Sequence, residues 1–188
     1  MEAAHSSSWI AAGDPLPAFE LEEVDGARLT LESLTAEGPA VLVFFRFAGC
    51  PACNIALPYY ERELAPGLRE LGATLVAVSP QIPERLVEIK RRHDLSFQVA
   101  TDRDNVLGGK LGVLYTANAA SQLAGRRNGS FIGDTTGTGT WDLPQPTVIV
   151  IGQDRRVAFV DVSPDWLVRT EAEPVLQAVR ALEAVAAE

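Results

Sequence analysis

The sequence predicts an α/β domain in which helices cover both faces of a central mixed sheet. Apolar runs typical of strands alternate with amphipathic segments typical of helices, which favours parallel strands joined by helical crossovers. Late in the chain, two strand-like runs around a short turn add an antiparallel pair. Because residues 1–13 are small and polar, we predict a flexible tail followed by one domain over residues 14–188.

The first half of the chain begins with a predicted hairpin. The segment Leu16–Leu34 alternates around Asp25-Gly26, a dipeptide that favours a tight turn between two strands. Continuous apolar runs then indicate strands buried on both faces, and periodic segments indicate helices. We expect strands at Pro39–Phe47 and Ala73–Ser79, and helices at Ile55–Leu71 and Pro83–Asp94.

The second half of the chain carries an insertion before the last strands. Residues 112–141 are rich in Gly, Thr, Asn and Ser and are predicted as loop with at most one helix. The neighbouring segments follow strand and helix patterns. They are a strand at Ser96–Asp102, a short helix capped by Asp102, two strands within Pro146–Val162, and a closing helix at Glu173–Val185.

Charge and composition exclude two classes of partner. The formal charge is −9, and an acidic surface repels nucleic-acid phosphates and anionic lipid. No apolar run approaches the roughly 20 residues that a membrane span needs. The segment Met1–Pro15 lacks the basic and apolar regions of a secretory signal. We therefore expect a cytoplasmic protein, in a compartment that disfavours structural disulfides.

Cys50 and Cys53 are the two cysteines of the chain, and they lie three residues apart. They occur where a buried strand ends and a helix begins. A thiolate there faces unpaired backbone N–H groups and the positive end of the helix dipole, which lowers its pKa. Pro51 suits the first helical position. We predict that Cys50 attacks a substrate and that Cys53 resolves the mixed disulfide.

Three other interpretations of the cysteine pair are weaker. A zinc site needs about four ligands, and the remaining candidates are His5 in the predicted tail and His93 on a polar helix face. Two inert core thiols seldom occupy the end of a strand, and a purely structural disulfide conflicts with the expected compartment. Spacing and context together favour redox activity, without a metal or a cofactor.

Two segments resemble parts of thioredoxin. The segment Gly49–Leu64 resembles the active-site helix, with Pro58 at the position of a proline that kinks it. The segment Leu143–Ile151 resembles the strand whose cis-proline faces the disulfide, with Pro146 and Thr147 as the matching pair. The resemblance implies a cis Gln145–Pro146 bond beside the cysteines, where it would position an extended substrate chain.

From about Leu16 to Leu182, the chain resembles the peroxiredoxin-like branch of the alkyl hydroperoxide reductase/thiol-specific antioxidant (AhpC/TSA) family. The resemblance implies a thioredoxin-like fold with an N-terminal β-hairpin and an insertion before the last strands. It also implies an antioxidant oxidoreductase that uses thiol chemistry. The matching stretches are "PAFELEEVDG", "VFFRFAGCPACN", "LVAVSPQ", "FQVATDRDN" and "WDLPQPTVIVIGQDRRVAFVDV".

The sequence departs from authentic peroxiredoxins around the attacking thiol. Val43 and Phe47 occupy the positions of the family's Pro and Thr/Ser, and Leu143–Pro146 contains no active-site arginine. Phenylalanine cannot donate a hydrogen bond to a peroxide oxygen, and fast O–O cleavage needs such donors. Arg46 is a candidate substitute or a surface residue. Phe44 stands where thioredoxins carry a buried acid.

The resulting hypothesis is a dithiol/disulfide oxidoreductase that reduces disulfides in preference to peroxides. Its partners would be a disulfide or hydroperoxide substrate and a reductant such as thioredoxin or a low-molecular-weight thiol, and the sequence allows a homodimer. One alternative is a thioredoxin-dependent peroxidase acting on hydrogen peroxide or organic hydroperoxides. Another is a non-catalytic redox sensor or binding module.

Other polar and aromatic residues carry weaker signals. Ser79–Gln81 ends a predicted parallel strand, at a rim where such sheets bind ligands, but a plain turn explains it equally well. Trp141 could cover the disulfide or fill core. Asp102, Glu20 and Glu32 are carboxylates that the sequence does not place relative to the cysteines.

Overall fold

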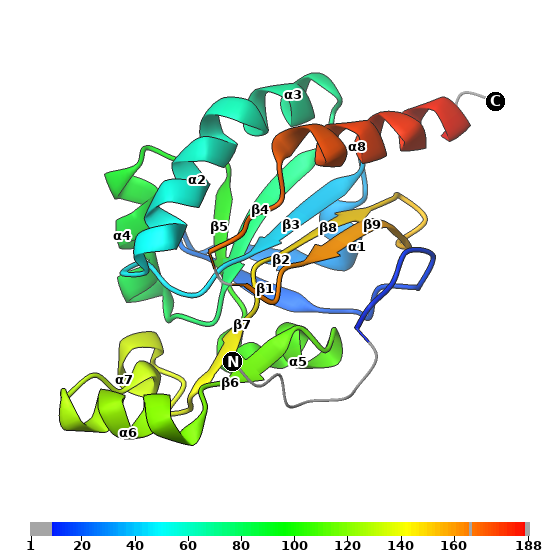
Figure 1. Cartoon of the computed structure of the whole chain (residues 1–188). Coiled ribbons are helices and arrows are strands. Elements are labelled where there is room, and N and C mark those ends of the chain that lie inside the picture. The colour runs from blue at the N-terminus through cyan, green and yellow to red at the C-terminus, as the bar shows by residue number, and fades with distance from the viewer. Residues whose placement is uncertain (1–8, 166, 187–188) are drawn as a thin grey trace.

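The computed structural model describes residues 9–165 and 167–186 (Figure 1). Its strands are β1 (Glu20–Glu23), β2 (Arg28–Thr30), β3 (Ala40–Phe44), β4 (Thr74–Ser79), β5 (Gln98–Thr101), β6 (Leu114–Thr116), β7 (Asp142–Pro144), β8 (Thr147–Ile151) and β9 (Val157–Val162). In the described ranges, seven of them form one sheet in the order β2-β1-β5-β4-β3-β8-β9. β3 pairs in parallel with β4 and antiparallel with β8, so the mixed sheet predicted from the sequence is confirmed.

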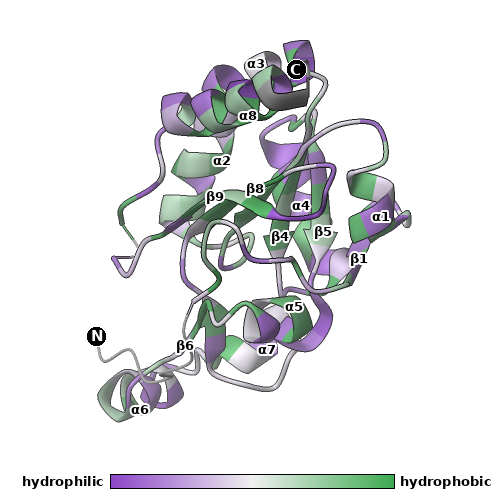
Figure 2. Cartoon of the chain, turned by 90° about the vertical axis from the view of Figure 1, so that its right-hand side faces the viewer, coloured by the Kyte–Doolittle hydropathy of each residue, from purple (hydrophilic) through white to green (hydrophobic). Residues whose placement is uncertain are grey.

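Helices cover both faces of this sheet. They are α1 (Leu31–Leu34), α2 (Pro51–Glu63), α3 (Ala65–Glu70), α4 (Pro83–Arg92), the 3₁₀ turn η1 (Arg103–Asn105), α5 (Val106–Lys110), α6 (Ala119–Arg127), α7 (Ile132–Thr136) and α8 (Ala172–Ala186). Figure 1 shows α2, α3 and α8 together over one face. Figure 2 shows apolar colour on the inner strands β8 and β9, whereas helices such as α1 and α8 carry both polar and apolar colour.

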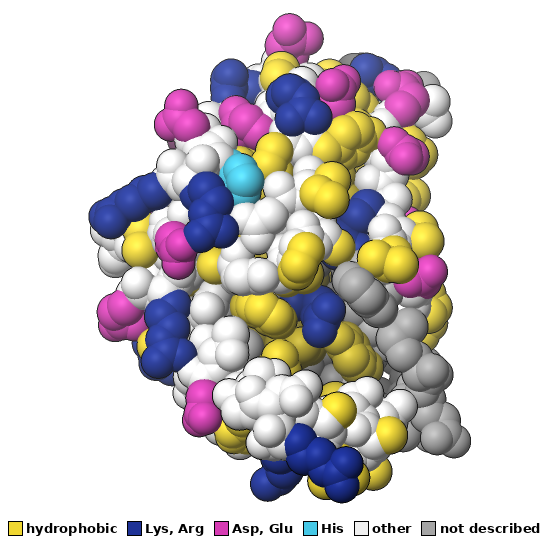
Figure 3. All heavy atoms as spheres, turned by 60° about the vertical axis from the view of Figure 1, so that its left-hand side comes forward, with side chains coloured by type: hydrophobic (Ala, Val, Ile, Leu, Met, Phe, Trp, Pro, Cys, Tyr) yellow, Lys and Arg dark blue, Asp and Glu magenta, His cyan; other side chains and the backbone are white. Residues whose placement is uncertain are grey.

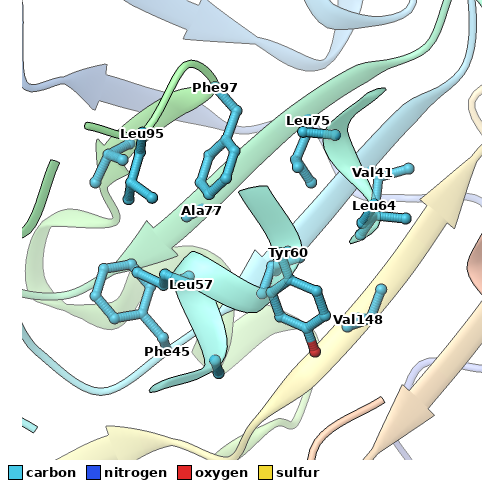
Figure 4. Close-up of a cluster of buried hydrophobic side chains, with 14 of the residues drawn as sticks. Val41, Phe45, Leu57, Tyr60, Leu64, Leu75, Ala77, Leu95, Phe97 and Val148 are labelled. Atoms are coloured by element: carbon cyan, nitrogen blue, oxygen red, sulfur yellow. The ribbon is translucent and has the colours of Figure 1, made fainter. Parts of the chain in front are cut away.

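Successive side chains of the central strands point to opposite faces of the sheet, and this divides the core into two clusters. In β3, Val41 and Val43 join the cluster under α2, α3, α4 and α8, whereas Leu42 and Phe44 join the cluster under α1 and α5. This is the two-residue period of a strand buried on both faces. Figure 4 shows Tyr60 of α2 in the first cluster. The packed sheet therefore fixes the position of α2, whose first turn carries the cysteines.

The N-terminal hairpin forms where the sequence predicts it. β1 pairs antiparallel with β2, with Leu21 opposite Leu29. The last four residues of the predicted strand segment instead form α1, because Thr30 caps it: the Thr30 hydroxyl accepts from the Ser33 N–H at 3.1 Å. Residues 1–8 of the predicted tail lie outside the described residues, and Ile10 and Gly13 donate backbone hydrogen bonds to the domain.

The helix expected at Ile55–Leu71 begins four residues earlier and is divided into α2 and α3. It begins at Pro51 because Cys50 acts as its N-cap and proline is favoured in the first turn. It breaks at Leu64, just before Pro66, which has no N–H to continue the hydrogen-bond ladder. The break leaves α2 as a separate helix whose N-terminus faces the end of β3.

The insertion is more ordered than its composition suggests. The sequence predicts loop with at most one helix over residues 112–141, whereas the structure has α6, α7 and β6 there, and β6 pairs with β7, which directly follows the insertion. Its own small core explains the order: the rings of Phe131 and Trp141 lie 4.8 Å apart, and a Cβ on Gly125 would meet Trp141 at 2.7 Å. Trp141 therefore fills the core of the insertion.

Candidate active site

Cys50 and Cys53 lie at the N-terminus of α2, with their sulfurs 2.7 Å apart as free thiols. Cys50 is the N-cap residue, and its Sγ accepts a hydrogen bond from the Cys53 backbone N–H at 3.4 Å. Both residues are 0% exposed, although Pro51 between them is exposed. The thiols are thus closed inside the fold, directly beneath a surface turn of α2.

The environment separates the acidities of the two thiols. The pKa of Cys50 is lowered to about 6, first by the hydrogen bond from the Cys53 thiol, then by the Cys53 backbone N–H and the charges of Arg46 and Arg169, against the effect of burial. The same hydrogen bond and burial raise the pKa of Cys53 well above its ordinary value. Near neutral pH, the pair therefore holds one thiolate at Cys50 and one thiol at Cys53.

The loop before Cys50 is held by polar side chains from two other elements. The Gln81 side chain accepts from the Ala48 N–H at 2.8 Å and donates to the Thr135 carbonyl at 3.1 Å. The Ser79 hydroxyl donates to the Arg46 carbonyl at 3.0 Å. The Ser79–Gln81 turn at the end of β4 therefore ties the loop to α7. This supports a role in the site beyond that of a plain turn.

Asn54 connects the same loop to α4. Its Nδ2 donates to the carbonyls of Ala48 and Cys50, at 2.7 and 2.8 Å. Its Oδ1 lies 2.7 Å from Nε2 of His93 and accepts from Arg92 at 3.2 Å. The backbone around Cys50 is therefore anchored on both sides of the sulfur.

Two arginines and a tyrosine lie near the thiols. Arg46 stacks over Phe47, with its guanidinium carbon 5.5 Å from the ring centre, and its charge reaches Cys50. Nη2 of Arg169 lies 3.9 Å from Sγ of Cys53. The pKa of Tyr115 is raised, mainly by burial and also by the two cysteines. Two cationic side chains thus lie near the pair of sulfurs in a chain whose net charge is −9.

The Gln145–Pro146 peptide bond is trans, so the cis bond predicted from the thioredoxin resemblance is wrong. Gln145 donates its N–H to Val113, and the Pro146 carbonyl accepts from the Ser163 N–H at 2.8 Å. These bonds hold the segment extended between its neighbours. Pro146 and Thr147 are buried and line a cavity of about 10 Å³ together with Arg169. The Thr147 hydroxyl donates to the Gln145 carbonyl.

The three carboxylates that the sequence left unplaced make structural contacts. Asp102 caps α5, accepting from the N–H groups of Leu107 and Gly108 at 2.9 and 2.8 Å. Burial raises the pKa of Asp102. Exposed Glu20 and Glu32 pair with Arg28 and Arg155. These contacts account for all three carboxylates without a role at the cysteines.

Sequence reasoning missed Asn54, Tyr115 and Arg169. Asn54 directly follows the motif, so an amide beside Cys53 is a signal that could have been used. Tyr115 and Arg169 carry no local signal, because tertiary structure alone brings the insertion and the loop after β9 to α2. Among the described residues, no cluster of His, Cys, Asp and Glu could hold a metal ion. In the same part of the chain, no helix is long and apolar enough to cross a membrane.

Comparison with known proteins gives two curated relatives of related chemistry. The chain is 33% identical over 99 residues to the thiol-disulfide oxidoreductase ResA of Halalkalibacterium halodurans, covering 51% of this chain and 53% of that protein. It is 29% identical over 105 residues to the peroxiredoxin Bcp of Escherichia coli K12, covering 55% of this chain and 65% of that protein. The chain therefore spans between half and two thirds of these relatives.

The fold and the family agree over most of the chain. The crystal structure of the peroxidoxin BcpB from Mycobacterium tuberculosis aligns with a TM-score of 0.72 and 22% identity, covering 92% of this chain and 98% of that one. This alignment confirms the thioredoxin-like fold of peroxiredoxins. The AhpC/TSA family model matches residues 12–160. The chain therefore belongs to the AhpC/TSA family.

Proposed function

We propose that this protein is an antioxidant thiol oxidoreductase that cycles Cys50 and Cys53 between dithiol and disulfide. One observation carries the proposal: two sulfurs 2.7 Å apart have pKa values moved in opposite directions at the N-terminus of one helix. A dithiol enzyme needs two different thiol pKa values. The thiolate is the nucleophile, and the second thiol must stay protonated until the mixed disulfide has formed. The cycle needs a thiol reductant to restore the dithiol, and we propose the cytoplasm, where such reductants keep thiols reduced, as its location.

The cycle has two exchange steps. The Cys50 thiolate attacks a substrate disulfide, forms a mixed disulfide and releases one thiolate, which takes up a proton. Cys53 then loses its proton and attacks Cys50 Sγ, forming the Cys50–Cys53 disulfide and releasing the second substrate thiol. The substrate gains two electrons and two protons that the protein loses. A reductant such as thioredoxin or a low-molecular-weight thiol restores the dithiol.

Two features support disulfides as the preferred substrate. Phe47, packed under Arg46, supplies no donor for a peroxide oxygen. Exposed apolar side chains flank the motif: Ile55 is 75% exposed, and Leu167 and Val168 beside Arg169 are 64% and 54% exposed. Figure 3 shows apolar side chains gathered around a basic one on one face of the molecule. We propose that Arg46, Pro146 and Thr147 form the wall against which a substrate sulfur is positioned.

A second candidate function is peroxide reduction, and the burial of the thiols favours it. Because Cys50 and Cys53 are 0% exposed, a small peroxide reaches them with less opening of the loop than a protein disulfide needs. We propose that Arg46 and Tyr115, whose charge and ring lie near the thiols, would then act on the peroxide oxygens. In this alternative, the Cys50 thiolate attacks one peroxide oxygen, the O–O bond breaks, and the other oxygen leaves and takes up a proton as water or an alcohol. Cys53 then attacks the Cys50 sulfenic acid, forming the disulfide and releasing water.

The substitution Cys53→Ser tests the proposed cycle. No third cysteine is present in the chain, so the mixed disulfide on Cys50 should persist. We expect intact-mass spectrometry to show one stoichiometric adduct on Cys53→Ser and none on the wild type after the same exposure to a small disulfide. Over the same exposure, the matched variant Cys50→Ser should form no adduct. Wild-type turnover by Cys53→Ser without an adduct would remove Cys53 from the proposal.

A further inference from the structure

The resolving step poses an electrostatic problem at Cys53. This thiol is fully buried, and its pKa lies well above the ordinary value. Formation of the mixed disulfide consumes the negative charge of Cys50, which removes two of the causes of that shift. Burial remains, and it still disfavours the Cys53 thiolate. A second attack therefore needs a group that stabilises negative charge on this buried sulfur.

We propose that Arg169 is a catalytic residue that stabilises the Cys53 thiolate during the resolving step. Its Nη2 lies 3.9 Å from Cys53 Sγ, within hydrogen-bond range for sulfur. A guanidinium stays protonated throughout the working pH range and donates without needing to lose a proton. The proposal rests on the dithiol cycle described above and assigns its second step to a residue outside the motif.

The segment that carries Arg169 is held in place by hydrogen bonds to β9 and α2. Nη1 of Arg169 donates to the Val168 carbonyl at 2.8 Å. The next residue, Thr170, donates its hydroxyl to Asp161 of β9 at 2.8 Å, and its carbonyl accepts from Tyr60 of α2 at 3.0 Å. These contacts join β9 and α2 directly beside the arginine. The guanidinium is therefore held where charge develops, which is the arrangement that lowers a barrier without reorganisation.

The proposed role is confined to one step. Cys53 loses its proton, and Arg169 pairs with the resulting thiolate while it attacks Cys50 Sγ. The Cys50–Cys53 bond forms, the bond from Cys50 to the substrate sulfur breaks, and the leaving thiolate takes up a proton. The negative charge thus passes from Cys53 to the leaving sulfur, where the proton neutralises it, so Arg169 is needed only while Cys53 carries the charge. Because the first attack uses Cys50, where Arg46 and the Cys53 thiol also act, that step depends less on Arg169.

The test separates the two steps with one equivalent of the neutral reagent dithiodipyridine. Attack by Cys50 releases one thiopyridone, and resolution by Cys53 releases the other. We expect Arg169→Met to slow the second release by about tenfold, which corresponds to about 1.4 kcal/mol of lost charge stabilisation. The first release should change by less than about threefold, in line with the smaller charge effect at Cys50. Arg169→Lys should restore much of the second rate.

Three controls make the result decisive. Arg180→Met removes an exposed arginine of α8 that pairs with Glu173, and both of its phases should match the wild type. Arg169→Gln should slow the second release as Arg169→Met does. Circular dichroism of both variants checks that neither has a folding defect. A second phase at the wild-type rate in both neutral variants, or an equal slowing of both phases, would overturn the proposal. Release of both thiopyridones by Cys53→Ser would instead refute the cycle itself.

Discussion

At the scale of single residues, the division of labour between Cys50 and Cys53 follows from one short contact. The Cys53 thiol donates to Cys50 Sγ, and this bond lowers one pKa while it raises the other. Arg46 and Arg169 add positive charge at the same place. This hydrogen bond and the nearby positive charges therefore make Cys50 the nucleophile, although neither sulfur is exposed.

Alkylation measured against pH should reveal this choice. We expect iodoacetamide to modify Cys50 before Cys53, with the rate rising through an inflection near the Cys50 pKa of about 6. Peptide mass spectrometry of samples quenched across the pH range measures each site separately. In Cys53→Ser the inflection should move upward, because the main hydrogen bond to Cys50 is weakened. Faster modification of Cys53 at neutral pH would contradict the assignment.

The sequence predicts the residues that are neighbours along the chain and misses those that are not. Cys50, Cys53 and Arg46 are recognisable because spacing and the start of a helix are local properties. Arg169 is separated from Cys53 by 116 positions, so no pattern along the chain links them. The cis bond at Pro146 was predicted wrongly, because hydrogen bonds from other segments decide the local backbone.

At the scale of elements, the loop between β3 and α2 is held by amides. Gln81 and Asn54 hold the two backbone groups of Ala48, and Asn54 also holds the Cys50 carbonyl. These bonds join the loop to the turn after β4 and to the start of α2, and the Asn54 side chain also contacts Arg92 and His93 at the end of α4. Opening of the loop, which a buried thiol requires for a bulky substrate, must break some of them.

Gln81→Ala should therefore destabilise the loop and the fold together. The change leaves the Ala48 N–H and the Thr135 carbonyl without this partner, which costs about 1–3 kcal/mol in the free energy of unfolding. We expect this loss in urea denaturation, together with faster alkylation of Cys50. The matched control Gln153→Ala removes one long, exposed hydrogen bond to Ala36 and should change stability by less than about 0.5 kcal/mol. Equal free energies of unfolding for the two variants would show that the Gln81 hydrogen bonds do not stabilise the loop.

The elements themselves follow the sequence where periodicity is strong. The buried strands β3, β4 and β8 match their apolar runs, and α4 matches its amphipathic pattern. The insertion does not, because its order depends on contacts such as Phe131 with Trp141 that composition does not express. Local propensity is a weak guide wherever tertiary packing supplies the stability.

At the scale of the whole molecule, the thiol pair links stability to pH. Cys50 has a folded pKa of about 6 and an ordinary value of 9.0, so between these limits the unfolded chain binds more protons than the folded chain. The free energy of unfolding of the reduced protein should therefore rise with pH in this window. Above about pH 9 the trend should reverse, because folded Cys53 keeps a proton that the unfolded chain releases.

Reduced wild type compared with Cys50→Ser isolates this linkage. One pKa unit is worth about 1.4 kcal/mol, so the wild type should gain at most about 4 kcal/mol relative to the variant between pH 6 and pH 9. Urea denaturation at several pH values, with a reductant present, measures the difference. Parallel stability curves for the two proteins would mean that Cys50 is not an acidic thiol in the folded state.

The choice between disulfide and peroxide as substrate is tested most directly by two rate constants. Reduced protein is mixed rapidly with a mixed-disulfide substrate or with hydrogen peroxide, and the fluorescence of its three tryptophans follows oxidation. Phe47 removes one donor for a peroxide oxygen, whereas disulfide exchange needs only the thiolate and the second thiol. We therefore predict the larger second-order rate constant for the disulfide. Rapid consumption of peroxide with a barely detectable disulfide reaction would contradict the account and favour the peroxidase.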